Sequence, residues 1–298
     1  MIESITAGLG GRVAERWAAL LLSPAVAFWA LGAGAWVWAW PDSAGDTIDR
    51  LATLSPLAQG AIGVGALLVV AASGFVVEQS ASMVLRVLQG YWPGWLRAPL
   101  ASRHRKRLEA DDDLWQKLYA QWESGAATEA EAAELLTVER RLAQLPGRAE
   151  QIMPTQLGNV LRAAESRPHD WYGLDAVRCW PRLWLVLPDP VKAELSAARA
   201  QLDAAATWWS WGALTAVWTV FTPWALLVAA VGCGLAYPVL VGAAARFGEL
   251  VDATFDLHRG LLYDALGWER PDNPEAERAR GEALTQALWR GDVSAAPR

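Results

Sequence analysis

The sequence predicts an all-α integral membrane protein, and three observations carry this prediction. Apolar residues make up 53% of the 298 positions and charged residues only 19%, a balance that excludes a disordered chain. Several long stretches contain no charged residue, and each is long enough for a helix that crosses a bilayer. The 19 Trp residues outnumber the 5 Tyr and 5 Phe together, and indole rings gather at membrane interfaces. No strand-like alternation bounded by turn residues occurs, so the expected class is all-α.

The first two predicted spans lie in the N-terminal part of the chain. Residues 18–40 form a run of 23 without a charged side chain, and residues 57–77 form another of 21. A helix rises about 1.5 Å per residue, so roughly 20 residues cross the hydrocarbon core of a bilayer. Each run is therefore expected to cross the membrane once.

Residues 204–245 form the longest uncharged stretch. Its 42 residues include no Asp, Glu, Lys, Arg or His. As one helix it would be about 63 Å long, twice the thickness of the hydrocarbon core. The stretch must fold back, and Thr222-Pro223 is the natural corner because the residue before proline avoids the helical region. This predicts two further spans, at about 205–221 and 224–245. The alternative for all four runs is a set of buried core helices, which rarely lack charges altogether.

Basic residues predict the orientation of the four spans. Cytoplasmic flanks of membrane helices carry an excess of Lys and Arg. Arg12 and Arg16 precede the first span, whereas the loop at 41–56 holds Arg50 against three Asp residues. Six basic residues follow the second span: Arg86, Arg97, Arg103, Arg105, Lys106 and Arg107. We therefore expect a multi-pass protein of the plasma (inner) membrane with both termini in the cytoplasm and the 41–56 loop outside.

The predicted organisation has four parts. Residues 1–99 hold the first two spans and an interfacial segment, residues 100–203 form a cytoplasmic helical domain, residues 204–246 form a transmembrane hairpin, and residues 247–298 form a cytoplasmic amphipathic helix and tail. Helix starts in the cytoplasmic domain are marked by a capping box at Thr128 and Glu131, by Thr155 after a proline, and by Asp189 before one. The helix that starts near position 190 is expected to run into the third span without a break.

A basic and aromatic region follows the second span. Tyr91, Trp92 and Trp95 mark the depth of the lipid headgroups. The basic cluster after them predicts contacts to membrane lipids, with anionic headgroups bound by Arg103, Arg105, Lys106 and Arg107. The alternative is that this cluster only sets the orientation and forms the solvated start of a helix.

Motifs for catalysis and for cofactors are absent from the sequence. The 2 Cys and 3 His residues lack the spacing of a metal site, and no phosphate-binding glycine loop or Gly-x-Ser-x-Gly motif occurs. We therefore expect no enzyme, no cofactor and no metal, with both cysteines as structural thiols. A net charge of −6 and a pI near 5.2 argue against a nucleic-acid partner.

Charges of alternating sign lie among aromatic residues between positions 153 and 188. A candidate cytoplasmic pocket is formed by Arg162, Glu165, Asp175 and Arg178, which would face an effector or a substrate anion. In the alternative interpretation, this segment is an ion-paired helical core that packs near the membrane.

The uncharged spans favour a pore over a coupled transporter. Proton- and ion-coupled transporters carry titratable groups at membrane depth, and the four predicted spans contain none. Glycines in the second and fourth spans allow close helix packing within or between subunits, so a homo-oligomer is expected. The layout of four spans, both ends inside and a large cytoplasmic part between spans two and three resembles that of bestrophin-type anion channels. The resemblance is one of topology, and no site residue is carried over.

The function expected from these observations is an oligomeric ion channel with a helical cytoplasmic vestibule. The second span is the expected pore helix, and its candidate pore-lining residues are Gly63, Val70, Phe75 and Glu78. The alternative for Val70 and Phe75 is that both pack against the third and fourth spans as ordinary core. An uncharged apolar pore of this kind gates by dewetting. The alternative function is a non-conducting scaffold or signalling protein that recruits a cytoplasmic partner protein.

Overall fold

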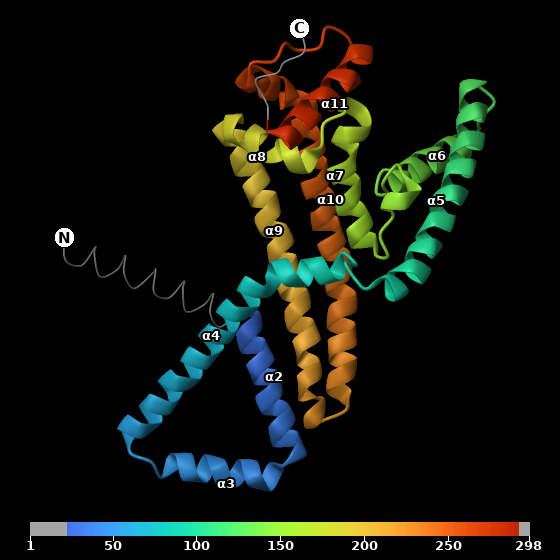
Figure 1. Cartoon of the computed structure of the whole chain (residues 1–298). Coiled ribbons are helices and arrows are strands. Elements are labelled where there is room, and N and C mark those ends of the chain that lie inside the picture. Colours follow the sequence, from blue (N-terminus) through green and yellow to red (C-terminus); the bar gives the residue numbers. More distant parts are fainter. Residues whose placement is uncertain (1–22, 292–298) are drawn as a thin grey trace, which may run out of the picture. The chain divides into compact units, whose positions relative to one another are not determined.

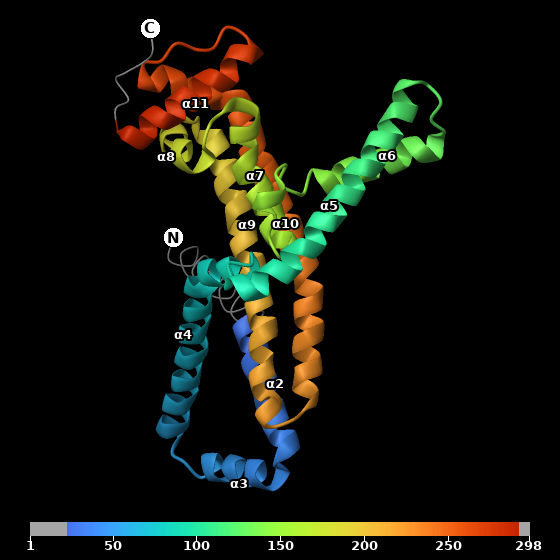
Figure 2. The same ribbon diagram turned by 45° about the vertical axis from the view of Figure 1, so that its right-hand side comes forward.

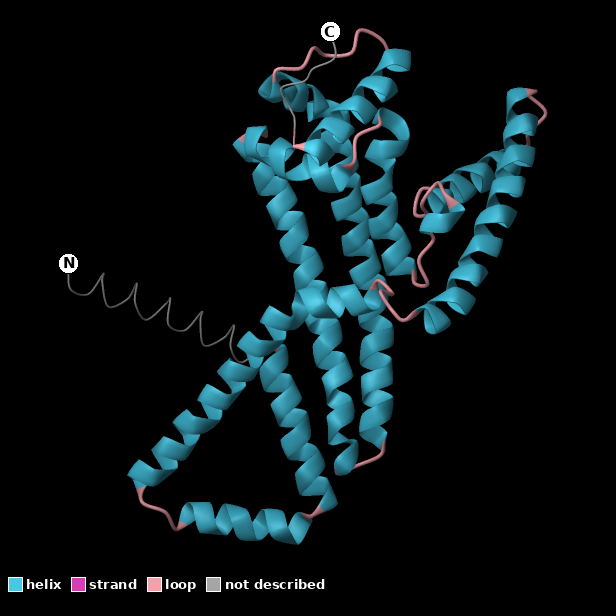
Figure 3. Cartoon of the chain, viewed as in Figure 1, coloured by secondary structure: helices cyan, strands magenta, loops and turns pink. Residues whose placement is uncertain are grey.

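The computed structural model of the chain describes residues 23–291. Its α-helices are α2 (Pro24–Ala39), α3 (Pro41–Ala52), α4 (Pro56–Leu88), α5 (Gly94–Glu123), α6 (Glu129–Leu142), α7 (Gln156–Tyr172), α8 (Ala176–Val186), α9 (Asp189–Leu214), α10 (Trp224–Leu266) and α11 (Pro274–Arg290) (Figure 1). Two 3-10 helices, η1 (Ala149–Gln151) and η2 (Thr215–Val220), complete the regular structure of this range. Helices account for 85% of the residues and no strand occurs in the described part, which confirms the all-α prediction (Figure 3).

Two of the described helices, α4 and α10, are long and apolar enough to cross a membrane, whereas the sequence predicts four spans. The first predicted span is represented by α2, with 16 residues; positions 18–22 of that span, together with Arg12 and Arg16, lie outside the described residues. The third predicted span is divided, because α9 ends at Leu214 and the chain continues as η2. By the length and composition of single helices, the described residues therefore contain two candidate membrane-spanning helices and not four.

The contacts within the chain divide it into two compact units. Among the described residues, one unit comprises positions 23–84 together with Asp203–Val239, and we refer to it as the apolar unit. The other comprises Leu85–Leu202 together with positions 240–291, and we refer to it as the polar unit. Because α4, α9 and α10 each pass from one unit into the other, these helices contribute to both.

In the apolar unit the chain turns back at Thr222-Pro223, where the sequence predicts a corner. The backbone N–H of Thr222 donates to the Trp218 carbonyl at 3.1 Å. On either side of this turn, α9 and α10 run side by side in opposite directions (Figures 1 and 2). A Cβ at Gly212 would lie 3.2 Å from the backbone nitrogen of Cys233, a tight contact, so glycine favours the close approach of α9 to α10 at that position.

An aromatic cluster joins α2 to η2 in the same unit. The ring centres of Phe28 and Trp218 lie 4.9 Å apart, and the indole N–H of Trp218 donates to the Phe28 carbonyl at 3.2 Å. The indole N–H of Trp29 donates to the hydroxyl of Ser73 on α4 at 3.1 Å. A Cβ at Gly32 would overlap the Trp218 ring. These tryptophans therefore form internal contacts, whereas their abundance in the sequence suggests an interfacial role.

The predicted 41–56 loop contains a helix, α3, which the sequence analysis misses. Pro41 begins this helix, and proline is tolerated in a first turn because its missing N–H has no partner there. With 12 residues, α3 is about 18 Å long and lies between the end of α2 and the start of α4 (Figures 1 and 2).

The core of the polar unit is formed by α8, α10, α11 and the start of α9. Its most buried large side chains, each at most 2% exposed, are Leu183, Leu195, Phe255, Leu262, Tyr263 and Leu284. Gly281 lets α11 lie against the end of α7, since a Cβ there would overlap the carbonyl oxygen of Tyr172. The side chain of Thr285, one turn later, donates to the Gly173 carbonyl at 3.0 Å. These contacts fix α11 against the α7–α8 connection.

Helices α5 and α6 form an antiparallel pair with a small core of their own, made by Leu118, Leu135 and Val138. The capping box predicted at the start of α6 is confirmed. The hydroxyl of Thr128 accepts the N–H of Glu131, and the Glu131 carboxylate accepts the N–H of Thr128 at 2.8 Å. The bounds of α6 therefore follow from a local sequence pattern.

α7 continues further than local signals indicate, whereas α10 passes beyond the predicted fourth span into the amphipathic helix that the sequence predicts from position 247. α7 begins after its N-cap Thr155, as predicted, and then continues through Pro168 to Tyr172. Proline inside a helix removes one backbone hydrogen bond, and the burial of Ala163 and Ala164 on the same helix offsets this loss. α10 is one uninterrupted helix from the corner at Pro223 to Leu266.

Candidate functional site

Three of the four candidate pore-lining residues of α4 lie on uncovered surface. Phe75 is 62% exposed, Glu78 is exposed, and a Cβ at Gly63 would meet no atom within 4 Å. Val70 is half-buried and packs against the aromatic cluster that contains Phe28. Gly63 and Val70 lie seven residues, about two turns, apart and so share a face of α4. This face is covered near Val70 and uncovered near Gly63.

The reason for this difference is that α2 and α4 diverge toward α3 (Figures 1 and 2). At their far ends the two helices are joined by α3, whose 12 residues span about 18 Å. Helices in direct contact lie about 8–10 Å apart. Where they meet α3, the ends of α2 and α4 are therefore about two such distances apart.

The four candidate lipid contacts lie on α5, and their side chains are all exposed: Arg103, Arg105, Lys106 and Arg107. None of these four forms an ion pair within residues 23–291. Arg105 also lines a shallow groove of about 290 Å³ together with Arg97 and Glu150. Burial and the neighbouring Arg107 lower the pKa of the half-buried His104. The cluster thus presents several uncompensated positive charges to its surroundings.

The four residues of the predicted cytoplasmic pocket form two separate pairs. Arg162 and Glu165 form an exposed ion pair on α7 at 3.1 Å. Asp175 caps α8 by accepting the backbone N–H of Arg178 at 3.2 Å. The guanidinium carbon of Arg178 lies 3.7 Å from the centre of the Trp289 ring. Arg162 and Glu165 thus lie on α7, and Asp175 and Arg178 lie at the start of α8.

Glu165 nevertheless lines a cavity of about 300 Å³ in the polar unit. Side chains of α4, α7, α8, α9 and α10 surround it, and most of them are apolar. Arg199 of α9 lies at its rim, with its guanidinium carbon 6.0 Å from the centre of the Phe247 ring. Sequence reasoning finds Glu165 but misses the cavity, because the lining residues come from positions as distant as 85 and 251.

A second polar feature of this unit is the pair formed by Arg167 of α7 and Asp252 of α10. Arg167 also donates to the carbonyl of Ala143, at the end of α6. Oδ1 of Asp252 is buried and has no hydrogen-bond partner in the described part of the chain. Burial raises the pKa of Asp252 to about 6, although Arg167 opposes this effect; Asp256 and Glu249, each about one turn away on α10, add to it.

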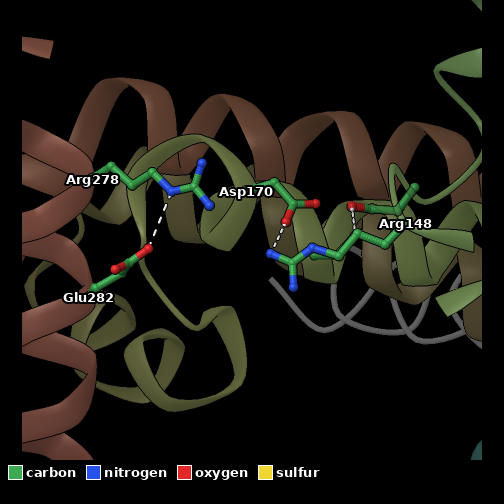
Figure 4. A network of polar contacts seen from close by, with 6 residues as sticks. Arg148, Asp170, Arg278 and Glu282 are labelled. Carbon is green, nitrogen blue, oxygen red and sulfur yellow. Dashed lines mark hydrogen bonds and ion pairs between the residues drawn. The ribbon is translucent and has the colours of Figure 1, made fainter. Parts of the chain in front are cut away.

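Further hydrogen bonds and ion pairs occur in the polar unit. Tyr172 donates its hydroxyl hydrogen to Asp256 at 2.6 Å, and Arg259 donates to Glu277 of α11 at 2.5 Å. Figure 4 shows two more pairs, Arg148 with Asp170 and Arg278 with Glu282, with nitrogen–oxygen distances of 2.5 Å and 3.2 Å. Most of these partners are far apart in the sequence. For the members of this network that lie within 153–188, the alternation of charge in the sequence is the local pattern that indicates ion pairing.

Cys179 and the possible metal ligands of residues 23–291 offer no reactive centre beside these features. Burial raises the pKa of the Cys179 thiol to about 12, so this group stays protonated and unreactive. No group of three His, Cys, Asp or Glu side chains in this range is placed to hold a metal ion.

Comparisons with known proteins identify no relative. No protein-family model matches the chain, and no curated protein and no solved structure is similar to it. The topological resemblance to bestrophin-type channels therefore receives no support from a structural neighbour.

Proposed function

We propose that the protein crosses the plasma membrane four times, keeps both termini in the cytoplasm, and assembles through α4 into an oligomeric pore. Two crossings, α4 and α10, are supported by their length and apolar composition. A third is supported by the pairing of α9 and η2 with α10, because a helix that runs beside a membrane helix occupies the same layer (Figures 1 and 2). The fourth is the uncharged run at 18–40, of which α2 is a part.

The observation that carries the assembly is the uncovered face of α4 at Gly63. Three helices packed side by side place the outer two about 16–20 Å apart. The span of about 18 Å set by the 12 residues of α3 lies within this range. One helix of a second copy therefore fits between the outer ends of α2 and α4 at normal spacing, and Gly60 and Gly63, with open space at their Cβ positions, allow it to approach closely.

The part of the α4 surface that a second copy would not cover favours a pore over a compact oligomer. Its exposed side chains from Ile62 to Val76 are apolar, and no titratable group occurs between Leu57 and Val77. Glu78 follows where the uncharged run ends. Helices of this kind, arranged around a common axis, line an uncharged pathway that opens when water enters it.

The assembly is tested by Gly63→Leu, which fills the face that a second copy is expected to cover. We expect the detergent-solubilised particle to lose subunits, measured as its mass by light scattering, while membrane insertion is kept because leucine is favourable in lipid. Gly65→Leu is the matched control. Gly65 is two residues away, on the other side of the same helix, and a Cβ there would also meet no atom within 4 Å. Equal masses for wild type and Gly63→Leu would contradict the proposed interface.

A second candidate function, recruitment of a cytoplasmic partner protein, is favoured by one observation. The α5–α6 pair exposes large apolar side chains, with Tyr119 at 37%, Trp122 at 56% and Leu136 at 53%. Aromatic side chains are enriched where proteins bind one another. A scaffold of this kind would bind its partner equally well with or without ionic current, so conductance separates the two functions.

A further inference from the structure

The cavity of about 300 Å³ in the polar unit is apolar inside and polar only at its rim. Its floor is made by Ala164, Ala176, Leu202 and Val251, none of which is more than 9% exposed. Val177, which is 65% exposed, stands at the opening. Small-molecule sites have this form and volumes from about 300 Å³ upward. A volume at the lower end of this range suits one hydrocarbon chain and is too small for a whole two-chain lipid.

Two of the helices that form the cavity, α9 and α10, continue directly from the cavity into the uncharged stretch of residues 204–245. Leu202 of α9 lines the cavity, and the stretch begins at position 204. Phe247 of α10 also lines it, and the stretch ends at position 245. If these helices cross the membrane, as in the proposed function, their residues at the cavity lie at the depth of the cytoplasmic headgroups. Lipids of that leaflet then lie beside the two helices next to the residues that line the cavity.

The rim offers a cation for a lipid phosphate. Arg199 lines the cavity on α9, and Gln89 adds a side-chain amide. Glu165, the acidic group of the rim, is compensated by its ion pair with Arg162. Guanidinium groups bind phosphates through two parallel hydrogen bonds, so Arg199 suits the phosphate of a lipid whose chain enters the apolar interior.

We propose that this cavity binds one acyl chain of a membrane phospholipid, with the lipid phosphate at Arg199. The proposal rests on the membrane crossing of the proposed function and adds a ligand that a pore does not require. α7 and α8 contain no uncharged run long enough to cross a membrane. A bound acyl chain would therefore bring these two helices into contact with a membrane lipid.

The test is photo-crosslinking in vesicles of phosphatidylcholine and phosphatidylglycerol that contain a phosphatidylcholine with a diazirine in one acyl chain. We expect labelled peptides from α7 and α8 in the wild type. Val177→Trp blocks the opening with a surface side chain and should lower the labelling of α7 at least tenfold. Leu185→Trp is the matched control, since Leu185 is 77% exposed on the same helix and does not line the cavity. Both variants should keep the wild-type elution volume.

The phosphate contact is tested with Arg199→Gln, which should lower the labelling of α7 and α8 several-fold. Lys192→Gln, a change of charge on the same helix away from the cavity, should leave it unchanged. A diazirine fatty acid, which has a chain but no phosphate, should label these helices weakly. Equal labelling by the fatty acid, with no effect of Arg199→Gln, would overturn the assignment of a phospholipid.

The uncharged part of α10 is the internal reference, because it meets acyl chains in any membrane-embedded form of the protein. Labelling of α10 without labelling of α7 and α8 overturns the lipid site and leaves the membrane crossing intact. Absence of label from α10 as well means that the membrane crossing itself fails, and the lipid site fails with it. Labelling of α7 that persists in Val177→Trp also overturns the proposal, since the chain then binds outside the cavity.

Discussion

Gly281→Ala is expected to destabilise the polar unit by about 2–4 kcal/mol. In an ordinary helix interior the same change is stabilising, by up to about 1 kcal/mol, because alanine restricts the unfolded chain. Gly281 lies inside α11, but its Cβ would overlap the carbonyl oxygen of Tyr172. That oxygen belongs to the backbone and cannot turn away as a side chain can. The sign of the effect therefore reports directly on the packing of α11 against the end of α7.

The structural consequence is a shift of α11 away from the core. Such a shift breaks the hydrogen bonds of Thr285 with Gly173 and with the backbone of Asp175, each 3.0 Å long, and exposes Leu284. Thermal unfolding measures the loss of stability, and trypsin cleavage within α11 measures its release. Gly45→Ala in α3 is the control, because its Cβ would meet no atom within 4 Å. A Gly281→Ala protein as stable as this control would show that α11 does not pack as described.

The second large effect is a pH dependence of stability that arises at Asp252. Its pKa is raised from 3.8 to about 6, so between these values the folded chain holds a proton that the unfolded chain has released. Stability from this group is therefore fully present below about pH 4 and is lost as the pH rises through about 6. At about 1.4 kcal/mol per pH unit, the difference reaches about 3 kcal/mol.

Asp252→Asn isolates this contribution. The amide keeps an oxygen that can accept from Arg167 but cannot ionise, so the variant should be at least as stable as the wild type at pH 7.5. His104 acts in the opposite direction near pH 6, because its pKa is lowered. The difference between the two unfolding curves cancels this effect. We expect the stability of the wild type relative to Asp252→Asn to fall as the pH rises from 5 to 7.5. A difference in stability that stays constant with pH would contradict this account, and so would a variant less stable than the wild type by several kcal/mol at pH 7.5. Either result would mean that the ion pair with Arg167 affects the pKa of Asp252 more than burial does.

Local signals predict where many of the helices begin. Thr128 and Thr155 each accept a backbone N–H of the first turn that follows, α9 begins at Asp189, and Pro223 marks the corner before α10. These features depend on residues within one turn of each other, so the sequence alone contains the necessary information. The same holds for the all-α class, which follows from uncharged runs and helical periodicity.

Tertiary contacts decide what the sequence does not predict. The pair of Arg167 and Asp252 joins positions 85 residues apart, and neither residue stands in a recognisable motif. Pro168 interrupts the pattern of α7, yet the helix continues because its neighbours are buried. The cavity at Arg199 needs side chains from five helices. Local patterns cannot indicate such features, since they depend on which helices meet.

The proposed pore is tested most directly by single-channel recording from purified protein in planar bilayers. Discrete current steps are expected from the wild type, and Phe75→Ser should raise the open fraction, because a polar side chain favours water in an apolar pore. Phe75 is 62% exposed, so this change should leave the fold of the single chain intact. Gly63→Leu, which is expected to dissociate the assembly, should be silent. If correctly assembled wild type and Phe75→Ser both remain silent, the protein is not a pore, and recruitment of a partner becomes the leading function.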